Sequence, residues 1–240
     1  RLGQGNKAAA FRILGNIVLL NVIFGVATMA ACLLFLDKLL FLFGASEATI
    51  GFAHEYMSIL LWGNVITHLY LGLNAILRST GYPTKSMVVM LISVGVNCVL
   101  DPLFIFGFDW GIAGSAYATV IAQTTALVYE LVHFANPKNF LHFRRSIFRL
   151  RKDITLKIIS IGMAPFLVQS CASLVSMLNN NALREYGGDL HIGAFSIVNR
   201  IAMLFIMIVN GLNQGMQPIV GYNYGAKLYD RVLKTLRMGI

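Results

Sequence analysis

Long apolar segments separated by short polar loops fill most of the sequence. A membrane-spanning helix needs about 20 predominantly apolar residues, and several segments reach that length. The segments long enough to span a bilayer cover residues 11–36, 50–77, 87–107, 111–134, 154–183 and 192–220. They do not alternate polar and apolar positions, as the strands of a membrane β-barrel do. The pattern therefore predicts an all-α fold, that of a polytopic helical membrane protein.

The composition supports this prediction and argues against an enzyme. Of the 240 residues, 57% are hydrophobic and 12% are charged, whereas soluble domains average about 25% charged residues. The cysteines, Cys32, Cys98 and Cys171, each lie in an apolar run without metal-ligand spacing, so we interpret them as small core residues. The sequence also lacks Ser-His-Asp, zinc and phosphate-loop spacings. We expect no enzymatic activity and no cofactor.

The basic residues indicate how the chain is oriented in the membrane. If the six segments alternate in direction, all but three of the 19 lysines and arginines fall on one side, the exceptions being Lys38, Arg184 and Arg200. Cytoplasmic loops carry such an excess of basic residues. We therefore predict that this side is cytoplasmic, and that the net charge of +9 reflects topology. A nucleic-acid partner is not expected.

Residues 136–153 form the most polar stretch of the chain. Arginines and lysines alternate there with phenylalanine, leucine and isoleucine. This mixture favours a basic amphipathic helix lying on the membrane surface. A nucleic-acid-binding arm is the weaker alternative, because membrane spans flank the stretch on both sides.

A short repeat suggests how the chain divides. Gly5-Asn6-Lys7 recurs as Gly225-Ala226-Lys227, in both cases after a polar turn and before a basic helix start. The interval contains six spans, as expected for a transporter built from two parallel repeats. We predict three parts, which are the last four helices of a first lobe (1–135), a basic cytoplasmic linker (136–153) and the first helices of a second lobe (154–240).

Asp101 is the main candidate for a functional side chain. It is the one ionisable residue of the segment 87–107, and it lies four positions after Asn97, on the same helix face. Pro102 follows and is expected to bend the helix. An acid in hydrocarbon is costly and usually marks an ion or proton pathway. The alternative is a carboxyl group that a neighbouring helix satisfies and that serves only packing.

The last two spans offer candidates for a substrate cavity. Gln169 and Asn180 are polar residues of the span 154–183, while Met203 and Met207 belong to the methionine-rich span 192–220. Methionine suits adaptable binding surfaces. For the amides, hydrogen bonding between helices is an equal alternative. For the methionines, packing against lipid is the alternative.

Several segments together resemble a known transporter family. They are Ile76-Leu-Arg-Ser-Thr-Gly-Tyr-Pro83, Asn97-Cys-Val-Leu-Asp-Pro-Leu-Phe104, Gly111-Ile-Ala-Gly-Ser-Ala116, Asn199-Arg200 and Gln217-Pro-Ile-Val-Gly-Tyr-Asn-Tyr-Gly-Ala226. In this order they resemble the multidrug and toxic compound extrusion (MATE) transporters. The resemblance implies a partial chain, comprising the third to eighth helices and the start of the ninth in a two-lobed, twelve-helix protein. The first residue, Arg1, and the absence of a signal-peptide pattern agree with a chain cut from a longer one.

The resemblance also implies a site and an activity. In one branch of the family, a proton or cation site in the first lobe combines an asparagine, an aspartate and a threonine, which match Asn97, Asp101 and Thr119. The family's first-helix aspartate has no counterpart in this chain. Another branch has a glutamate on the seventh helix, but the matching residues 165–173 contain no acid, which favours coupling in the first lobe.

The function implied is secondary antiport, in which organic cations leave in exchange for protons or sodium. We expect a monomeric, multi-pass protein of the inner (cytoplasmic) membrane, in contact with lipid. The alternative is a flippase for lipid-linked saccharides or another amphiphile. A flippase requires a strongly basic cavity, and Arg200 is the one basic residue in the middle of a predicted span.

Overall fold

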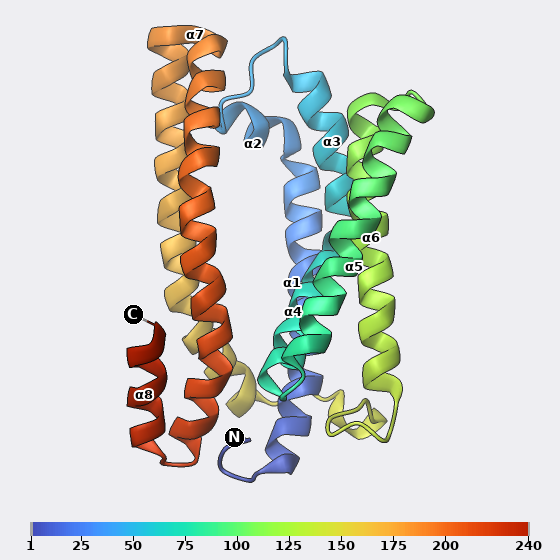
Figure 1. The fold of residues 1–240 in the computed structure, drawn as a ribbon. Coiled ribbons are helices and arrows are strands. Elements are labelled where there is room, and N and C mark those ends of the chain that lie inside the picture. Colours follow the sequence, from blue (N-terminus) through green and yellow to red (C-terminus); the bar gives the residue numbers. More distant parts are fainter. Residues whose placement is uncertain (1, 240) are drawn as a thin grey trace.

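The computed structural model describes residues 2–239, with residues 184, 188, 189 and 192 described by their backbone alone. The described chain is helical and contains no strand. Its helices are α1 (Lys7–Leu34), α2 (Leu36–Leu42), α3 (Ile50–Trp62), α4 (Asn64–Ser79), α5 (Pro83–Pro102), η1 (Leu103–Gly107), α6 (Gly111–Ala135), η2 (Arg145–Ile147), α7 (Lys152–Gly225) and α8 (Tyr229–Gly239). Figure 1 shows two groups of upright helices, with α7 and α8 on one side and α1 to α6 on the other. The all-α prediction is confirmed.

The buried core lies among the helices of residues 7–135, which we call the α1–α6 bundle. Its largest cluster combines residues of α1, α4, α5 and α6 with Leu141 and Ile147 of the following loop. The fully buried members include Leu73, Leu77 and Val89. Most large apolar side chains outside this cluster are exposed, in α7 as well as in the bundle, as expected for helices that face lipid or further helices.

The second predicted span is broken into two helices. α3 and α4 meet at Gly63 with a bend of 56°. A Cβ atom at Gly63 would lie 2.7 Å from Val120 Cγ2, so glycine allows α6 to approach the bend closely. Asn64 then donates to the carbonyl oxygen of Gly25 at 2.9 Å and to Thr28 Oγ1 at 2.7 Å. These bonds hold the start of α4 against α1 and account for a kink at this glycine.

The turn between α4 and α5 follows the sequence signals closely. Gly81 has a φ of +89°, a conformation that glycine adopts without a steric penalty. Pro83 then opens α5, where its missing N–H would have had no intrahelical partner. At the other end of α5, Pro102 is followed by the single π-helical turn η1. The bend expected at this proline therefore takes the form of a widened turn.

The prediction of an amphipathic helix in the linker is wrong. Between α6 and α7 the only helical element in the described chain is the short 3-10 turn η2. Leu141 and Ile147 point into the core, with 4% and 5% of their surface exposed. These two side chains pack against the core instead of forming part of a membrane-facing stripe, whereas Phe140, Phe148 and Leu150 are exposed.

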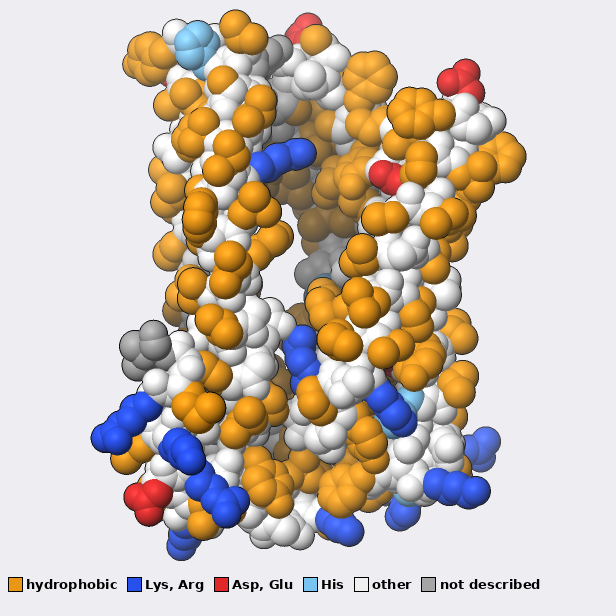
Figure 2. Space-filling model, in the orientation of Figure 1, with side chains coloured by type: hydrophobic (Ala, Val, Ile, Leu, Met, Phe, Trp, Pro, Cys, Tyr) orange, Lys and Arg blue, Asp and Glu red, His pale blue; other side chains and the backbone are white. Residues whose placement is uncertain are grey.

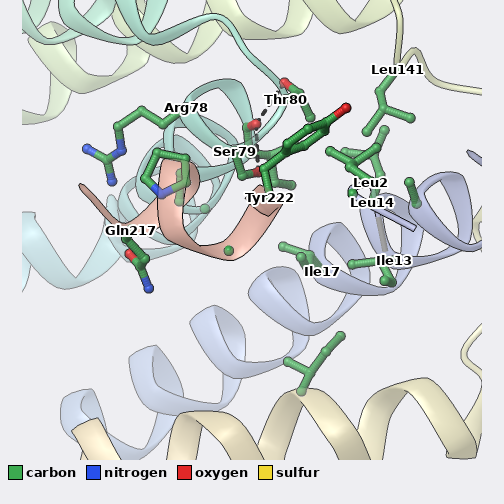
Figure 3. Close-up of a pocket in the computed structure, with 18 of the residues that line it drawn as sticks. Leu2, Ile13, Leu14, Ile17, Arg78, Ser79, Thr80, Leu141, Gln217 and Tyr222 are labelled. Carbon is green, nitrogen blue, oxygen red and sulfur yellow. Dashed lines mark hydrogen bonds between the residues drawn. The ribbon is translucent and has the colours of Figure 1, made fainter. Parts of the chain in front are cut away.

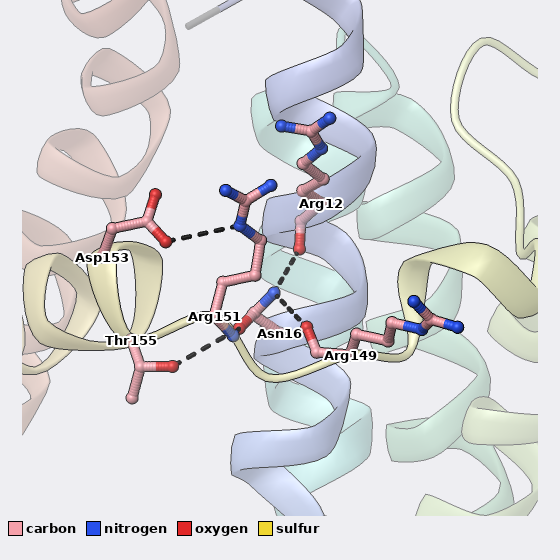
Figure 4. A network of polar contacts seen from close by, with 6 residues as sticks. All are labelled: Arg12, Asn16, Arg149, Arg151, Asp153 and Thr155. Atoms are coloured by element: carbon pink, nitrogen blue, oxygen red, sulfur yellow. Dashed lines mark hydrogen bonds and ion pairs between the residues drawn. The ribbon is translucent and has the colours of Figure 1, made fainter.

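Asn16 of α1 holds this linker in place. Its side chain is fully buried, and it donates to the backbone oxygens of Arg12 at 2.8 Å and Arg149 at 3.2 Å. Its oxygen accepts from the Arg151 amide at 3.0 Å and from Thr155 Oγ1 at 3.4 Å (Figure 4). One amide side chain thus joins α1, the linker and the first turn of α7.

The helix α7 contains the last two predicted spans. It folds back on itself, so that two limbs, Lys152–Gly187 and Gly193–Gly225, run side by side (Figure 1). Five helices of the described chain are long and apolar enough to cross a membrane, or six if α3 and α4 form one bent span. This matches the six predicted segments.

The charged side chains gather as the sequence predicted. In Figure 2 most lysines and arginines lie at the lower end of the molecule, which we call the basic end. The linker, the N-terminus and the start of α8 lie near it, whereas α2 and the turn between η1 and α6 lie at the opposite end (Figure 1). The arrangement agrees with spans that alternate in direction.

The topology can be tested by labelling single cysteines. Asp109 and Ser146 are both exposed, at opposite ends of the molecule. A membrane-impermeant maleimide added to intact cells should label Asp109→Cys and leave Ser146→Cys unlabelled until the cells are permeabilised, because positively charged loops stay cytoplasmic. Labelling of Ser146→Cys from outside would show that the predicted orientation of the chain in the membrane is wrong.

The Asn16 network predicts a stability effect. Asn16→Ala removes four hydrogen bonds and leaves the Arg151 amide without its partner, so we expect a loss of roughly 1–3 kcal/mol in unfolding free energy. Thermal unfolding in detergent measures this loss. Asn223→Ala is the control, because the Asn223 side chain donates its hydrogen bond to the backbone oxygen of Ile219, within its own helix. Equal midpoints for the two variants would contradict the proposed role of Asn16.

Candidate functional site

The structure brings Asn97 and Thr119 together. Asn97 of α5 donates to Thr119 Oγ1 of α6 at 3.3 Å, and Thr119 in turn donates to the backbone oxygen of Ser115 at 3.0 Å. Both residues are half-buried. Small side chains make this approach possible, since Ala113, Ala116 and their neighbours on α6 are buried against other helices.

Asp101 lies one turn further along α5, immediately before Pro102. Its side chain is half-buried, and its Oδ1 atom is buried without a hydrogen-bond partner in the described chain. Asp101 therefore shares a helix face with Asn97 but is not joined to Asn97 or Thr119 by any hydrogen bond of the structure. A buried carboxylate oxygen without a donor is costly. A proton, a cation or a donor from another helix would relieve that cost.

The four tentative cavity residues lie apart from this site, on α7. Gln169 is exposed on its first limb, while Met203 and Met207 are more than half exposed on the second. Asn180 donates to the backbone oxygen of Phe43 at 3.2 Å and so connects α7 to the end of α2. None of the four lines the cavity described next. Their role in substrate binding stays a prediction.

A cavity of about 630 Å³ lies near the basic end, between α1, α4 and the end of α7. We call it the inner cavity. Figure 3 shows Ile13, Leu14 and Ile17 of α1 on one side, facing Arg78 of α4 and Gln217 and Tyr222 of α7. Its wall is mainly apolar, and polar groups come from Asn21, Arg78, Gln214 and Gln217. A mostly apolar wall with a few polar groups suits an amphiphilic molecule.

The sequence analysis misses one buried acid, Glu130 of α6, which is fully buried. The rule that selects Asp101 selects this residue as well, because Glu130 is the one acid of the segment 111–134. Glu130 lies near the end of a predicted span and close to His133, so the sequence alone makes it resemble a loop residue.

Comparison with known proteins agrees with the resemblance seen in the sequence. The MatE family profile matches residues 1–103 and 165–240. The multidrug export protein MepA of Staphylococcus aureus is 28% identical over 235 residues, which are 97% of this chain and 51% of MepA. The MepA protein of Staphylococcus saprophyticus is 28% identical over 216 residues, covering 90% of this chain and 47% of that protein. The chain thus spans about half the length of the curated relatives it matches.

Solved structures show the same fold. The outward-facing conformation of a multidrug resistance MATE family transporter of the MOP superfamily superposes with a TM-score of 0.87 and 26% identity, covering 100% of this chain and 53% of that one. An inward-facing conformation of such a transporter gives a TM-score of 0.76, with 26% identity and coverage of 99% and 57%. The present arrangement of helices is closer to the outward-facing one.

Proposed function

Because this chain belongs to the MatE family of multidrug and toxic compound extrusion transporters, we propose that the complete protein is a secondary antiporter that exports organic cations in exchange for protons or sodium. The observation that carries the coupling part of this proposal is Asp101, whose buried Oδ1 has no hydrogen-bond partner among the described residues and lies one turn from the Asn97–Thr119 pair. The relatives are named as export proteins, and the chain is a transporter and not an enzyme.

In the proposed mechanism the two groups of helices separate alternately at the basic end and at the opposite end. At the basic end, the chain start lies against the end of α7, since a Cβ atom at Gly3 would collide with the Tyr222 carbonyl oxygen. At the opposite end, Asn181 of α7 donates to the Leu42 carbonyl oxygen of α2 at 2.8 Å. Each set of contacts must break in one half of an alternating-access cycle. A coupling ion and a cargo can drive the change only by binding the two arrangements with different affinities.

Asp101 is suited to sense the coupling ion in this scheme. With a proton or sodium bound, its charge is compensated, while without one it is a carboxylate at the edge of hydrocarbon. The π-helical turn η1 begins directly after Pro102, so the backbone beside the carboxyl group is already irregular. A change of charge at Asp101 can therefore alter the packing of η1 against α6.

The location and partners follow from the same proposal. The complete protein is a multi-pass protein of the inner (cytoplasmic) membrane, with the basic end in the cytoplasm. Many exposed large apolar side chains, such as Phe106 and Val132, provide the surface for lipid. We propose a monomer without a nucleic-acid partner, with protons or sodium as the only coupling species and no cofactor.

The flippase alternative has one observation in its favour. Arg78 is the charged residue among those lining the inner cavity, and it could meet the phosphate of a lipid-linked substrate. A single arginine falls short of the strongly basic cavity that such a substrate requires. The acid at position 101 also favours positively charged cargo.

The decisive variant is Asp101→Asn, which keeps the size of the side chain and mimics a permanently neutral carboxyl group. We expect it to reach the membrane, to bind dye, and to lose most of the gradient-driven efflux, because a neutral side chain can no longer gain or lose the coupling charge. Fluorescent-dye efflux from vesicles under an imposed pH or sodium gradient measures this at matched protein amounts. Asp109→Asn, an exposed acid of the neighbouring turn, is the control. A full-rate Asp101→Asn transporter would leave Asp101 a packing residue.

The hydroxyl group of Thr119 gives a graded companion test. Thr119→Ser keeps the acceptor for Asn97 Nδ2, whereas Thr119→Val removes it at nearly constant volume. We expect Thr119→Val to reduce coupled efflux in the same assay less than Asp101→Asn does, and Thr119→Ser to remain near the wild-type rate. Identical rates for the two threonine variants would show that the hydroxyl has no role in coupling.

A further inference from the structure

Glu130 of α6 is a fully buried acid, separate from the half-buried Asp101. None of its surface is exposed. Its Oε1 atom accepts a hydrogen bond from Asn74 Nδ2 at 3.2 Å, and its Oε2 atom is buried without a partner in the described chain. The ion pairs found among the described residues involve other acids, Asp37 and Asp153. No lysine or arginine therefore compensates this carboxyl group directly.

The neighbours of Glu130 are fixed in orientation. Ser86 of α5 donates its hydroxyl to Asn74 Oδ1 at 2.7 Å, and Asn74 Nδ2 donates to the Ser86 backbone oxygen at 3.1 Å. Asn74 and Ser86 are 3% and 1% exposed. Because the Asn74 oxygen already accepts from Ser86, the amide presents its N–H group to Glu130. The site thus offers one donor to a group that has two acceptor oxygens.

A charged carboxylate in such a site is expensive, since a buried charge needs a counter-charge or several hydrogen bonds. A proton on Oε2 removes the charge, and the resulting O–H group needs one acceptor and no counter-charge. A sodium ion would need a shell of several oxygens, but the amide of Asn74 faces Glu130 with its nitrogen. The donor set therefore favours a proton as the occupant.

Glu130 also ends a line of polar side chains inside the α1–α6 bundle. On α6, Thr119, Gln123, Glu130 and His133 share one face by helical period. Ser86, Ser93 and Asn97 share a face of α5, and Thr67, Tyr70 and Asn74 share a face of α4. Hydrogen bonds join these faces in steps: Asn97 to Thr119, Thr67 to Gln123, Asn74 to both Ser86 and Glu130, and Lys85 to His133.

The line connects the region of Asp101 with the basic end. Thr119 and Glu130 are eleven residues apart on α6, or about 16 Å along the helix axis. His133 follows one turn later and lies 3.2 Å from Lys85 Nζ through its Nδ1 atom. Movement of a proton from one pair to the next requires side-chain rotation or a bridging water.

The titratable and charged groups around Glu130 come from each helix packed against it. They are Tyr70 and Arg78 of α4, Lys85 of α5 and His133 of α6. Tyr70 is buried within electrostatic range of both Glu130 and Arg78. The basic groups all lie toward the basic end of the bundle, so a proton that leaves Glu130 has its exit beside His133.

We propose that Glu130 is a second proton-binding side chain of the transporter, which receives the proton from the Asp101 region and releases it at the basic end. In each cycle one O–H bond forms at Oε2 and is later broken, the proton entering from the opposite end and leaving to the cytoplasm. The transport part rests on the proposed antiport function, whereas proton binding by Glu130 does not. A purely structural role would keep Glu130 in one protonation state throughout.

Infrared difference spectroscopy of the complete protein in lipid vesicles tests proton binding directly. Spectra in acidic and alkaline buffer should contain a carboxylic C=O band that changes with pH. We expect this band to be lost in Glu130→Gln and kept in both Asp101→Asn and Glu55→Gln, the latter a matched change at an exposed acid of α3. Absence of any pH-dependent band assigned to Glu130 would overturn the proposal, and so would a band that follows sodium at constant pH.

Two further measurements complete the test. Ser86→Ala frees the Asn74 amide to turn, so the pH at the midpoint of the change in the Glu130 band should shift. An unchanged midpoint would contradict the assignment of the band to Glu130, and this test remains available even if Glu130→Gln fails to fold. In dye-efflux vesicles, Glu130→Gln should lose most of the pH-driven rate, and a full rate would exclude Glu130 from the proton path. If the wild-type protein shows no pH-driven efflux, the antiport function fails while the infrared result still decides proton binding.

Discussion

Hydrocarbon offers no hydrogen bonds, so each polar group of a membrane span must find its partner within the protein. In the α1–α6 bundle this constraint selects which helix faces meet. The faces of α4, α5 and α6 that carry amides and hydroxyls turn toward one another, and their side chains bond in pairs, as Asn97 with Thr119 and Asn74 with Ser86. The buried side-chain atoms without a partner in the described chain belong to Asn21, Asp101 and Glu130. These exceptions lie at the inner cavity and in the two proposed proton sites, where a cargo or an ion can supply what the protein does not.

The same constraint explains where the helices are irregular. The bend between α3 and α4 leaves polar groups near the middle of a span, and Asn64 compensates by bonding to the α1 backbone at Gly25. Pro102 removes a backbone donor, and the wider turn η1 follows it, with the Phe108 amide donating to the Leu103 carbonyl oxygen at 3.0 Å. At the first of these places, contacts with a neighbouring helix stabilise a sequence feature that would disrupt an isolated helix, and at the second the local backbone adapts.

The spans and the gathering of basic side chains at one end could be predicted from the sequence because hydrophobic length and loop charge act locally, residue by residue. The Asn97–Thr119 pair could be predicted only with the help of the family resemblance, since it joins two helices. The linker illustrates the limit of local patterns. Its phenylalanines and leucines suit an amphipathic helix, yet Leu141 and Ile147 are buried under α1 and Asn16 binds the backbone at Arg149 and Arg151. The inner cavity was beyond reach for the same reason, because its wall joins residues as distant as Ile13 and Tyr222.

The position of the two acids has a consequence for alternating access. Asp101 and Glu130 both belong to the α1–α6 bundle, and the polar residues between them lie on α4, α5 and α6 and not at the boundary with α7. A path for protons inside one group of helices need not break when that group moves against the other, whereas the inner cavity between the groups would open and close in the proposed transport cycle. Asn16 fixes the linker and the first turn of α7 to α1, so relative movement is confined to positions beyond this connection. Under the proposed antiport mechanism the ion and the cargo would use separate routes, and they would be coupled only through the affinity that each has for the two arrangements of the helices.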